Sequence, residues 1–86
     1  MGKMEKLLQR FLSKPSDFTF DELSGLLRGL NYEVIKLGKT SGSRVAFVNR
    51  NTGHIIRLHK PHPNPELKRY QLDDIETLLR KMGVIE

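Results

Sequence analysis

Residues 32–59 read YEVIKLGKTSGSRVAFVNRNTGHIIRLH, and this stretch decides the fold. It contains three runs rich in β-branched and aromatic residues, at 32–37, 43–49 and 54–59, which predict three strands. Two short segments containing glycine, at 38–42 and 49–53, separate the runs and favour turns. Short turns join strands that lie side by side in opposite directions, so we expect a three-stranded antiparallel meander.

Two helical patterns precede this stretch. Apolar residues at helical spacing predict a short amphipathic helix over residues 3–13, which ends at Lys14-Pro15. Thr19 and Glu22 have the spacing of a capping box, and a second apolar face follows them, which predicts a helix at about 20–30. Gly25 and Gly29 weaken this helix, but they let another element approach it closely.

One helical pattern follows the predicted strands. Residues 60–65 include three prolines and cannot form regular structure, but Pro65 is suited to the first position of a helix. Apolar residues from Leu67 to Met82, Tyr70 among them, continue at roughly helical spacing, with a short break expected at Gln71. The sequence therefore predicts an α+β fold of order α-α-β-β-β-α, in which helices cover one face of the sheet.

The length of 86 residues predicts one domain, 1–86, with a helical extension at 1–18 and a core at 19–86. The apolar face of the first helix is expected to complete the small core, and the alternative is a stripe that meets a partner. No cysteine is present, which excludes disulfides and thiolate zinc sites and fits a cytoplasmic location. No apolar run is long enough for a membrane span, and we expect neither a signal peptide nor a membrane partner.

Positive charge is concentrated in one part of the chain. Residues 36–69 carry eight of the fifteen basic residues and one acid, a charge of +7, whereas the remainder carries −2. Strand alternation indicates which of these side chains share a face. If Ile56 and Leu58 face the helices, then Arg57 and His59 face solvent; if Val45 and Phe47 are core residues, Arg44 and Ala46 point outward, unless a bulge reverses the order. His54 would share the face of Ile56.

This charge distribution favours a polyanionic partner, and histidines inside it suggest an RNA that is cut as well as bound. We expect RNA to be contacted by Lys39, Gly42, Ser43, Arg44, Arg57, Lys60, Lys68 and Arg69. Gly42-Ser43-Arg44 forms either a backbone cradle for phosphate or a plain hairpin turn. Lys68 and Arg69 flank the start of the last helix, where free amides favour an anion.

Residues 21–83 resemble the HicA toxins, small ribonucleases of a type II toxin–antitoxin system. The resemblance rests on Asp21-Glu22-Leu23, Leu30-Asn31-Tyr32-Glu33-Val34, Gly42-Ser43-Arg44, Lys60-Pro61-His62, Glu66-Leu67-Lys68 and Lys81-Met82-Gly83. It implies a fold like a double-stranded-RNA-binding domain, cleavage of messenger RNA, and inhibition by a HicB-type antitoxin. Residues 1–20 are an extension that compact members lack.

The resemblance also points to site residues. The family motif is usually glycine-serine-histidine with a catalytic histidine, and this chain has Arg44 there. Arginine is not a general base near neutral pH, but it binds phosphate and stabilises developing charge. His62 matches a family histidine before the last helix, and His59 is the alternative acid or base. Each could instead be a plain loop or strand-edge histidine.

We expect no metal and no other cofactor, since the two histidines of H-x-x-H lack a third ligand nearby and RNA supplies its own 2′-hydroxyl nucleophile. The leading hypothesis is therefore a metal-independent mRNA interferase with His62, His59 and Arg44 at its centre. The first rival is a non-catalytic RNA-binding module of the same fold. The second rival is an interaction protein whose basic face meets an acidic protein, for which salt-sensitive RNA binding should be absent.

Overall fold

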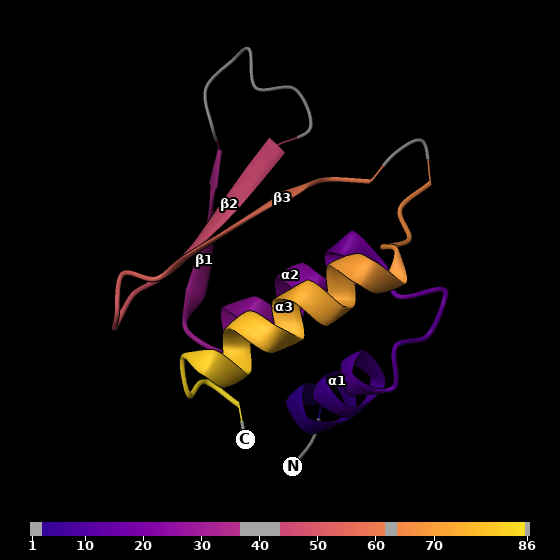
Figure 1. Cartoon of the computed structure of the whole chain (residues 1–86), viewed down its shortest axis with the longest axis horizontal. Coiled ribbons are helices and arrows are strands. Elements are labelled where there is room, and N and C mark those ends of the chain that lie inside the picture. The colour runs from indigo at the N-terminus through magenta and orange to yellow at the C-terminus, as the bar shows by residue number, and fades with distance from the viewer. Residues whose placement is uncertain (1–2, 37–43, 62–63, 86) are drawn as a thin grey trace.

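The computed structural model describes residues 3–36, 44–61 and 64–85, and its chain path is shown in Figure 1. In chain order the elements are α1 (Lys3–Leu12), α2 (Phe20–Gly29), β1 (Tyr32–Lys36), β2 (Arg44–Asn49), β3 (Ile55–His59) and α3 (Arg69–Lys81). This is the predicted α+β order, with the bounds of most elements within one residue of expectation.

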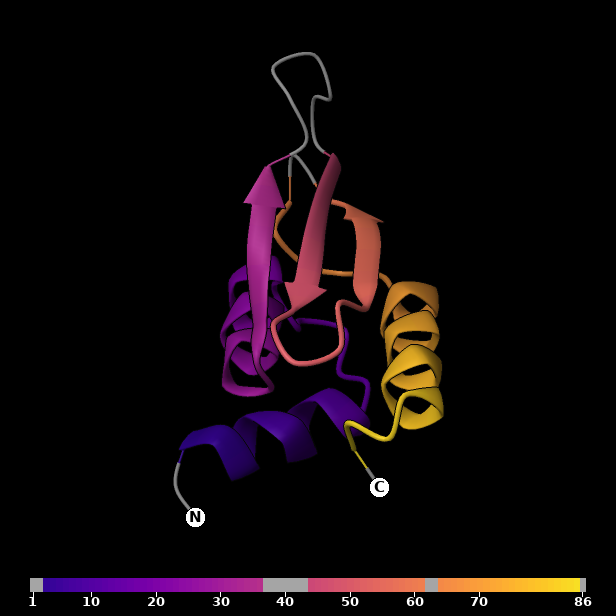
Figure 2. The ribbon, with the colours of Figure 1, turned by 90° about the vertical axis from the view of Figure 1, so that its left-hand side faces the viewer.

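The three strands form one sheet in the order β1-β2-β3, with both pairs antiparallel, so the predicted meander is confirmed. Val34 lies opposite Phe47, and Phe47 lies opposite Ile56, which places one residue of each strand in a single row. Figure 2 shows the sheet face-on, with α2 behind it, α3 beside its β3 edge, and no helix in front of its other face. Side chains on the covered face build the core, since alternate residues of a strand point to opposite faces.

The start of α2 is formed as its sequence indicates. Thr19 Oγ1 accepts a hydrogen bond from the Glu22 amide at 3.1 Å, and Glu22 Oε1 accepts one from the Thr19 amide at 3.0 Å. This reciprocal pair satisfies two donors that a helix N-terminus otherwise leaves free. The helix then buries Phe20, Leu23 and Leu26. The Phe20 ring lies 6.0 Å from that of Phe47 in β2, so α2 and the sheet share one core.

Helix α1 lies across the end of this layered structure, below α2 and α3 in Figures 1 and 2. Phe11 is fully buried, and its ring centroid lies 5.8 Å from that of Phe18, which precedes α2. A methyl group at Gly25 would lie 3.6 Å from Leu7, and one at Gly29 would overlap the end of the Met4 side chain. The predicted close approach at both glycines is therefore present, and α1 supplies the approaching side chains.

Ion pairs connect the N-terminal segment to both covering helices. Arg10 Nε donates to Glu22 Oε2 in α2 at 2.7 Å. Lys14 Nζ lies 2.9 Å from Asp73 Oδ1 and also pairs with Glu76, both in α3. The Lys14 side chain is only 12 % exposed, so these contacts are better shielded from solvent than an ordinary surface pair. Residues before the core are thus tied into it by packing and by charge.

The expected start of the last helix is wrong by several residues. Residues 65–67 are extended, and Thr19 pairs with Glu66 in an isolated antiparallel bridge. Phe20 N donates to Pro65 O at 2.9 Å, and Leu67 N donates to Phe18 O at 2.7 Å. The partners of these hydrogen bonds lie more than forty residues earlier in the chain. The backbone groups of residues 65–67 that bond to this segment are not available to the first turn of a helix that begins at Pro65. Helix α3 begins at Arg69 instead, and it has no break at Gln71.

Candidate nucleic-acid interface

The register of β2 and β3 brings three basic side chains onto the open face. Arg44 lies opposite His59, and Ala46 lies opposite Arg57. Arg44, Arg57 and His59 are all exposed, whereas Phe47 and Ile56 of the same strands are buried at 1 %. The faces predicted from alternation are therefore confirmed for these residues. Opposite residues have β-carbons about 5 Å apart and diagonal ones about 7 Å, so the three side chains can reach one ligand.

Ala46 is the exception among the residues expected to point outward. Its register places it on the open face, but it is only 2 % exposed. Its cross-strand partners are Ile35 and Arg57, whose long side chains flank a single methyl group. Alternation predicts a direction and not an accessibility, because exposure depends on the length of the neighbouring side chains. The open face therefore has an apolar floor beside Arg57.

A shallow groove of about 250 Å³ lies at this end of β2 and β3, lined by Arg44, Val45, Arg57, Leu58 and His59. We call it the basic groove. None of the described residues that line it is acidic. Guanidinium groups bind phosphate oxygens through charge-assisted, often paired, hydrogen bonds, and an imidazole adds a group able to exchange a proton near neutral pH. The arrangement suits an anion such as a phosphodiester.

The other described basic candidates lie around the end of β3 and the start of α3. Lys60 is exposed, and its Nζ lies 5.4 Å from the centroid of the Phe20 ring, close enough for a cation–π interaction. Lys68 and Arg69 are exposed at the start of α3, as predicted. The Lys68 amide donates to Gln71 Oε1 at 2.9 Å, so the protein itself satisfies that donor of the helix terminus.

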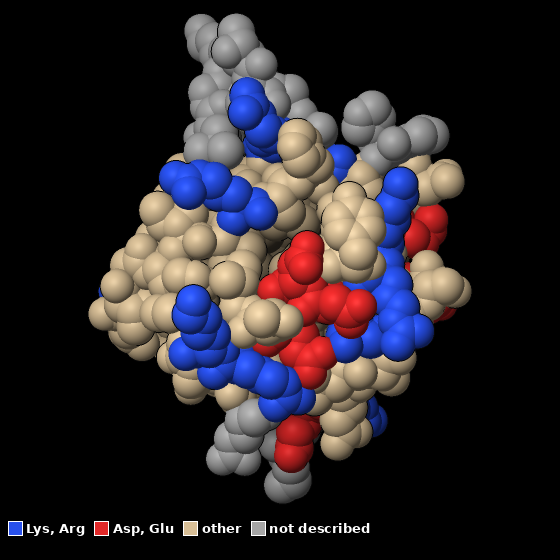
Figure 3. Space-filling view, in the orientation of Figure 1, with Lys and Arg blue, Asp and Glu red and all other residues tan. Residues whose placement is uncertain are grey.

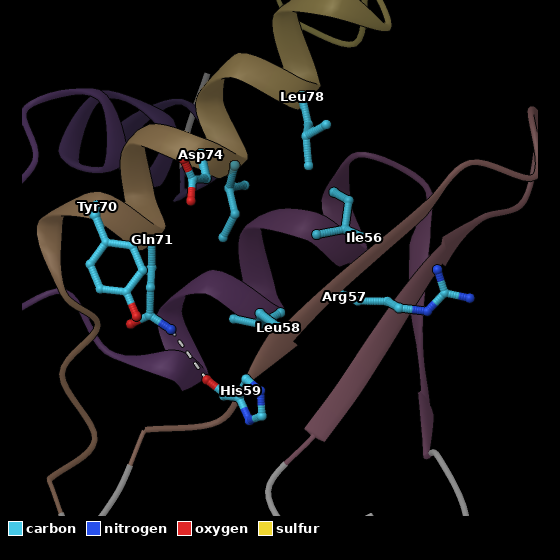
Figure 4. Close-up of a pocket in the computed structure, with 9 residues that line it drawn as sticks. Ile56, Arg57, Leu58, His59, Tyr70, Gln71, Asp74 and Leu78 are labelled. Atoms are coloured by element: carbon cyan, nitrogen blue, oxygen red, sulfur yellow. Dashed lines mark hydrogen bonds between the residues drawn. The ribbon is translucent and has the colours of Figure 1, made fainter.

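Gln71 joins the two elements that carry these groups. Its Nε2 donates to the His59 carbonyl oxygen at 3.3 Å, which links the first turn of α3 to the last residue of β3. Figure 4 shows this bond, with Tyr70 and Gln71 extending from α3 towards the His59 end of the strand. The start of α3 is thus held beside the basic groove. The sequence indicated a cationic start for α3 but did not place it against β3.

Several predicted site residues lie outside the described part of the chain. Lys39, Gly42, Ser43 and His62 belong to residues 37–43 and 62–63, for which no structure is described. Their roles in phosphate binding or catalysis stay predictions. Arg44, which follows Ser43, is the described member of the glycine-serine-arginine motif, and it is the first residue of β2.

Not every charge of the basic stretch is available to a ligand. Arg50 Nε donates to Glu33 Oε2 at 2.7 Å, so its charge is balanced by a carboxylate in β1. On the face shown in Figure 3, acidic side chains gather over the middle of α3, while basic side chains lie around them. The uneven charge of the sequence therefore becomes a local basic surface and not a uniformly basic molecule.

The third histidine belongs to the covered face. His54 is half-buried, and its Nδ1 lies 2.9 Å from the hydroxyl oxygen of Tyr32. Burial raises the pKa of the Tyr32 hydroxyl. Nearby, Asn49 Oδ1 accepts hydrogen bonds from the amides of Asn51 and Thr52, which fixes the turn between β2 and β3. This polar cluster has a structural function, and His54 does not join Arg44 and His59.

Tyr70 lies in α3, as its place in the helical pattern predicted. It is 62 % exposed, however, and it faces the space between α3 and β3 instead of the core. Sequence spacing contained a usable signal, because Tyr70, Asp74 and Leu78 recur every four residues and therefore share one face of a helix. What the spacing did not reveal is that this face lines a hollow between α3 and β3, opposite Leu58 and His59.

Two searches of the described residues concern other kinds of site. In the described ranges, no group of three or more histidine, cysteine, aspartate or glutamate side chains is placed to hold a metal ion. No helix there is both long and apolar enough to cross a membrane.

Comparison with protein families gives a match to most of the chain. The family model of the HicA toxin of bacterial toxin–antitoxin covers residues 20–84, from the first residue of α2 to just past α3. Helix α1 lies outside the matched region. No significant match was found among curated proteins or among solved structures. Because the family model spans most of the chain, including every strand and both covering helices, the chain belongs to the HicA family, the toxins of bacterial toxin–antitoxin systems.

Proposed function

We propose that this toxin is an endoribonuclease of the mRNA interferase type, which binds and cleaves messenger RNA without a metal ion. The observation that supports it best is the placement of Arg44 opposite His59, with Arg57 diagonal to Arg44, on the open face of a HicA-family sheet. These residues combine phosphate binding with proton exchange at one surface. A messenger RNA substrate also implies a cytoplasmic location.

The chemistry needs only groups that RNA and this surface supply. The 2′-oxygen attacks the adjacent phosphorus, a 2′-O–P bond forms, and the P–O5′ bond breaks, which leaves a 2′,3′-cyclic phosphate and a free 5′-hydroxyl. One proton leaves the 2′-hydroxyl, and one is delivered to the 5′-oxygen. In the proposal His62 or His59 serves as the base or the acid. Arg44 binds the phosphate and stabilises the negative charge that develops on its oxygens.

The proposal assigns a binding function to the remaining basic residues. Arg57 lines the basic groove with Arg44 and His59, and Lys60, Lys68 and Arg69 are exposed around the adjoining strand end. They would hold neighbouring phosphates of the same strand, together with Lys39, Gly42 and Ser43. A HicB-type antitoxin is proposed to inhibit the toxin by covering this surface. Acidic groups on the antitoxin would then replace the phosphates.

A second candidate is a non-catalytic RNA-binding module, and the residue at position 44 favours it. Where the family motif usually has histidine, Arg44 cannot take up a proton from the 2′-hydroxyl. The basic groove would keep its affinity for phosphate and lose the chemistry. Arg44→His separates the candidates, because cleavage gained by this variant, and absent from the natural chain, would favour the module.

The deciding experiment is cleavage of end-labelled single-stranded RNA in excess EDTA. The natural chain is compared with His59→Ala, His62→Ala and Arg44→Gln, and the control is Arg28→Gln, an exposed arginine on α2 that is not among the residues lining the basic groove. Discrete fragments that disappear with His59→Ala or with His62→Ala, that Arg44→Gln reduces and that Arg28→Gln leaves unchanged would support the nuclease. RNA that is bound but stays intact would refute the nuclease and favour the module.

A further inference from the structure

A second hollow lies next to the basic groove, between β3 and α3. It has a volume of about 200 Å³, and we call it the α3–β3 groove. Ile56 and Leu58 line it from the strand, and Leu78 lines it from the helix (Figure 4). Its size lies below the roughly 300–1,000 Å³ typical of sites for drug-sized ligands. It therefore suits one small ring system better than a folded segment of a partner.

The two grooves adjoin along β3. Arg57, Leu58 and His59 line both of them, so one ligand can contact both grooves at this strand. Figure 4 shows that the Arg57 side chain points away from α3, whereas Leu58 points towards it. Strand β3 thus places a charged and an apolar side chain next to each other where the two grooves adjoin. This matches a nucleotide, which carries a charged phosphate and an apolar ring face on one short unit.

Two residues of α3 equip the α3–β3 groove to hold a base. Tyr70 is 62 % exposed, the largest exposed fraction among the large hydrophobic side chains of the described residues, and its ring is available for stacking. Asp74 is one turn further along α3 and lines the same groove. Its carboxylate accepts hydrogen bonds from amino groups such as N4 of cytosine, and it repels phosphate.

We propose that the α3–β3 groove binds one nucleobase of the RNA whose phosphate occupies the basic groove, with Tyr70 stacking on the ring and Asp74 favouring a base that carries an amino group. The inference rests on the proposed RNA-binding function and adds base selection to it. Cytosine, adenine and guanine have an exocyclic amino group, whereas uracil lacks one. The toxin therefore discriminates against uracil at the position next to the bound phosphate.

The first test separates the two grooves by titrating the whole chain, with amide resonances observed by NMR. Ribose 5-phosphate is expected to shift the amides of Arg44 and Val45, which line only the basic groove. Cytidine, which carries no phosphate, is expected to shift those of Tyr70 and Asp74, and uridine is expected to do so more weakly. Shifts by the sugar phosphate with no shift by either nucleoside would overturn base binding and leave phosphate binding intact.

The second test measures RNA affinity by fluorescence anisotropy with labelled oligonucleotides of cytidine or of uridine. We expect Tyr70→Ala to lose roughly tenfold in affinity, which lies within the range found for base–aromatic stacking, and Tyr70→Phe to keep most of it. Asp74→Asn is expected to reduce the preference for cytidine. Its control is Asp21→Asn, which removes the same charge from an exposed position on α2 and should keep the preference.

The outcomes also separate this inference from the function on which it rests. Salt-sensitive RNA binding that Tyr70→Ala leaves unchanged would overturn base binding alone. A chain that binds no RNA at any salt concentration would overturn both proposals. Because Tyr70 and Asp74 are exposed, the variants should fold normally, and unfolding midpoints equal to that of the natural chain would confirm it.

Discussion

Replacement of Phe11 by alanine tests whether the segment before the HicA-matched region belongs to the folded unit. Phe11 is fully buried, and its ring packs against Phe18, which in turn lies 5.7 Å from the Arg10 guanidinium. Truncating a buried phenylalanine to alanine costs about 3–5 kcal/mol, because transfer energy is lost and a cavity remains. We therefore expect Phe11→Ala to lower the free energy of unfolding by about 3–5 kcal/mol.

That loss is large for a domain of this length. At roughly 0.05–0.15 kcal/mol per residue, 86 residues have a total stability of about 4–13 kcal/mol. Urea unfolding followed by circular dichroism is the assay, and with a slope of about 1 kcal/mol per molar the midpoint should fall by roughly 3 M or more. In the least stable case the variant would be unfolded without denaturant.

The matched control is Gln9→Ala, an exposed position on the same helix. It should change stability by no more than about 0.5 kcal/mol. If Phe11→Ala shifts the midpoint no further than Gln9→Ala does, α1 is not part of the cooperative core. The extension would then be a separate appendage, and the alternative that its apolar face meets a partner would gain support.

Three further predictions concern packing, pH and charge. Gly25→Ala should raise the free energy of unfolding by up to about 1 kcal/mol, measured by thermal or urea unfolding. Gly29→Ala should gain less or be destabilising, because its methyl group would overlap a side chain of α1. An equal gain in both variants would contradict the packing. The hydrogen bond from Lys14 lowers the pKa of Glu76 in the folded state. The contribution of Glu76 to folding stability is therefore complete above its ordinary pKa of 4.5 and is lost as the pH falls below that value. Glu76→Gln should flatten the acid side of a stability–pH profile, and an unchanged profile would refute this. Arg57→Gln should reduce the slope of log K against log salt for single-stranded RNA by about 0.7, while Arg28→Gln should leave it unchanged, and equal slopes for all three proteins would argue against a phosphate contact at Arg57.

Local sequence patterns were sufficient for most of the secondary structure. The capping box at Thr19, the β-rich runs and their short connections act between residues close in the chain, so they could be predicted without tertiary information. Strand alternation also predicted that Arg44, Arg57 and His59 share the open face, because the side-chain period of a regular strand is two. The family resemblance followed from the same linear motifs, and the family match over residues 20–84 confirms it.

The errors arose where distant segments compete for the same groups. Residues 65–67 bond to the backbone of residues 18–20, and this pairing delays α3 until Arg69. Ala46 is buried on an open face because its neighbours come from two other strands. Neither result follows from propensity, since each depends on contacts formed only after the chain has folded.

Sequence by itself determined the elements of this toxin, their order, the concentration of its positive charge and its family. Tertiary structure alone decided which charges are free, since Arg50 is paired with Glu33 while Arg44 and Arg57 line the basic groove. It also decided that Tyr70 is exposed beside β3, and it decided between the two alternatives for α1 by burying Phe11 in the core. The physical reason is that charge and periodicity are properties of the chain, whereas burial, pairing and the shape of a groove depend on which distant side chains become neighbours.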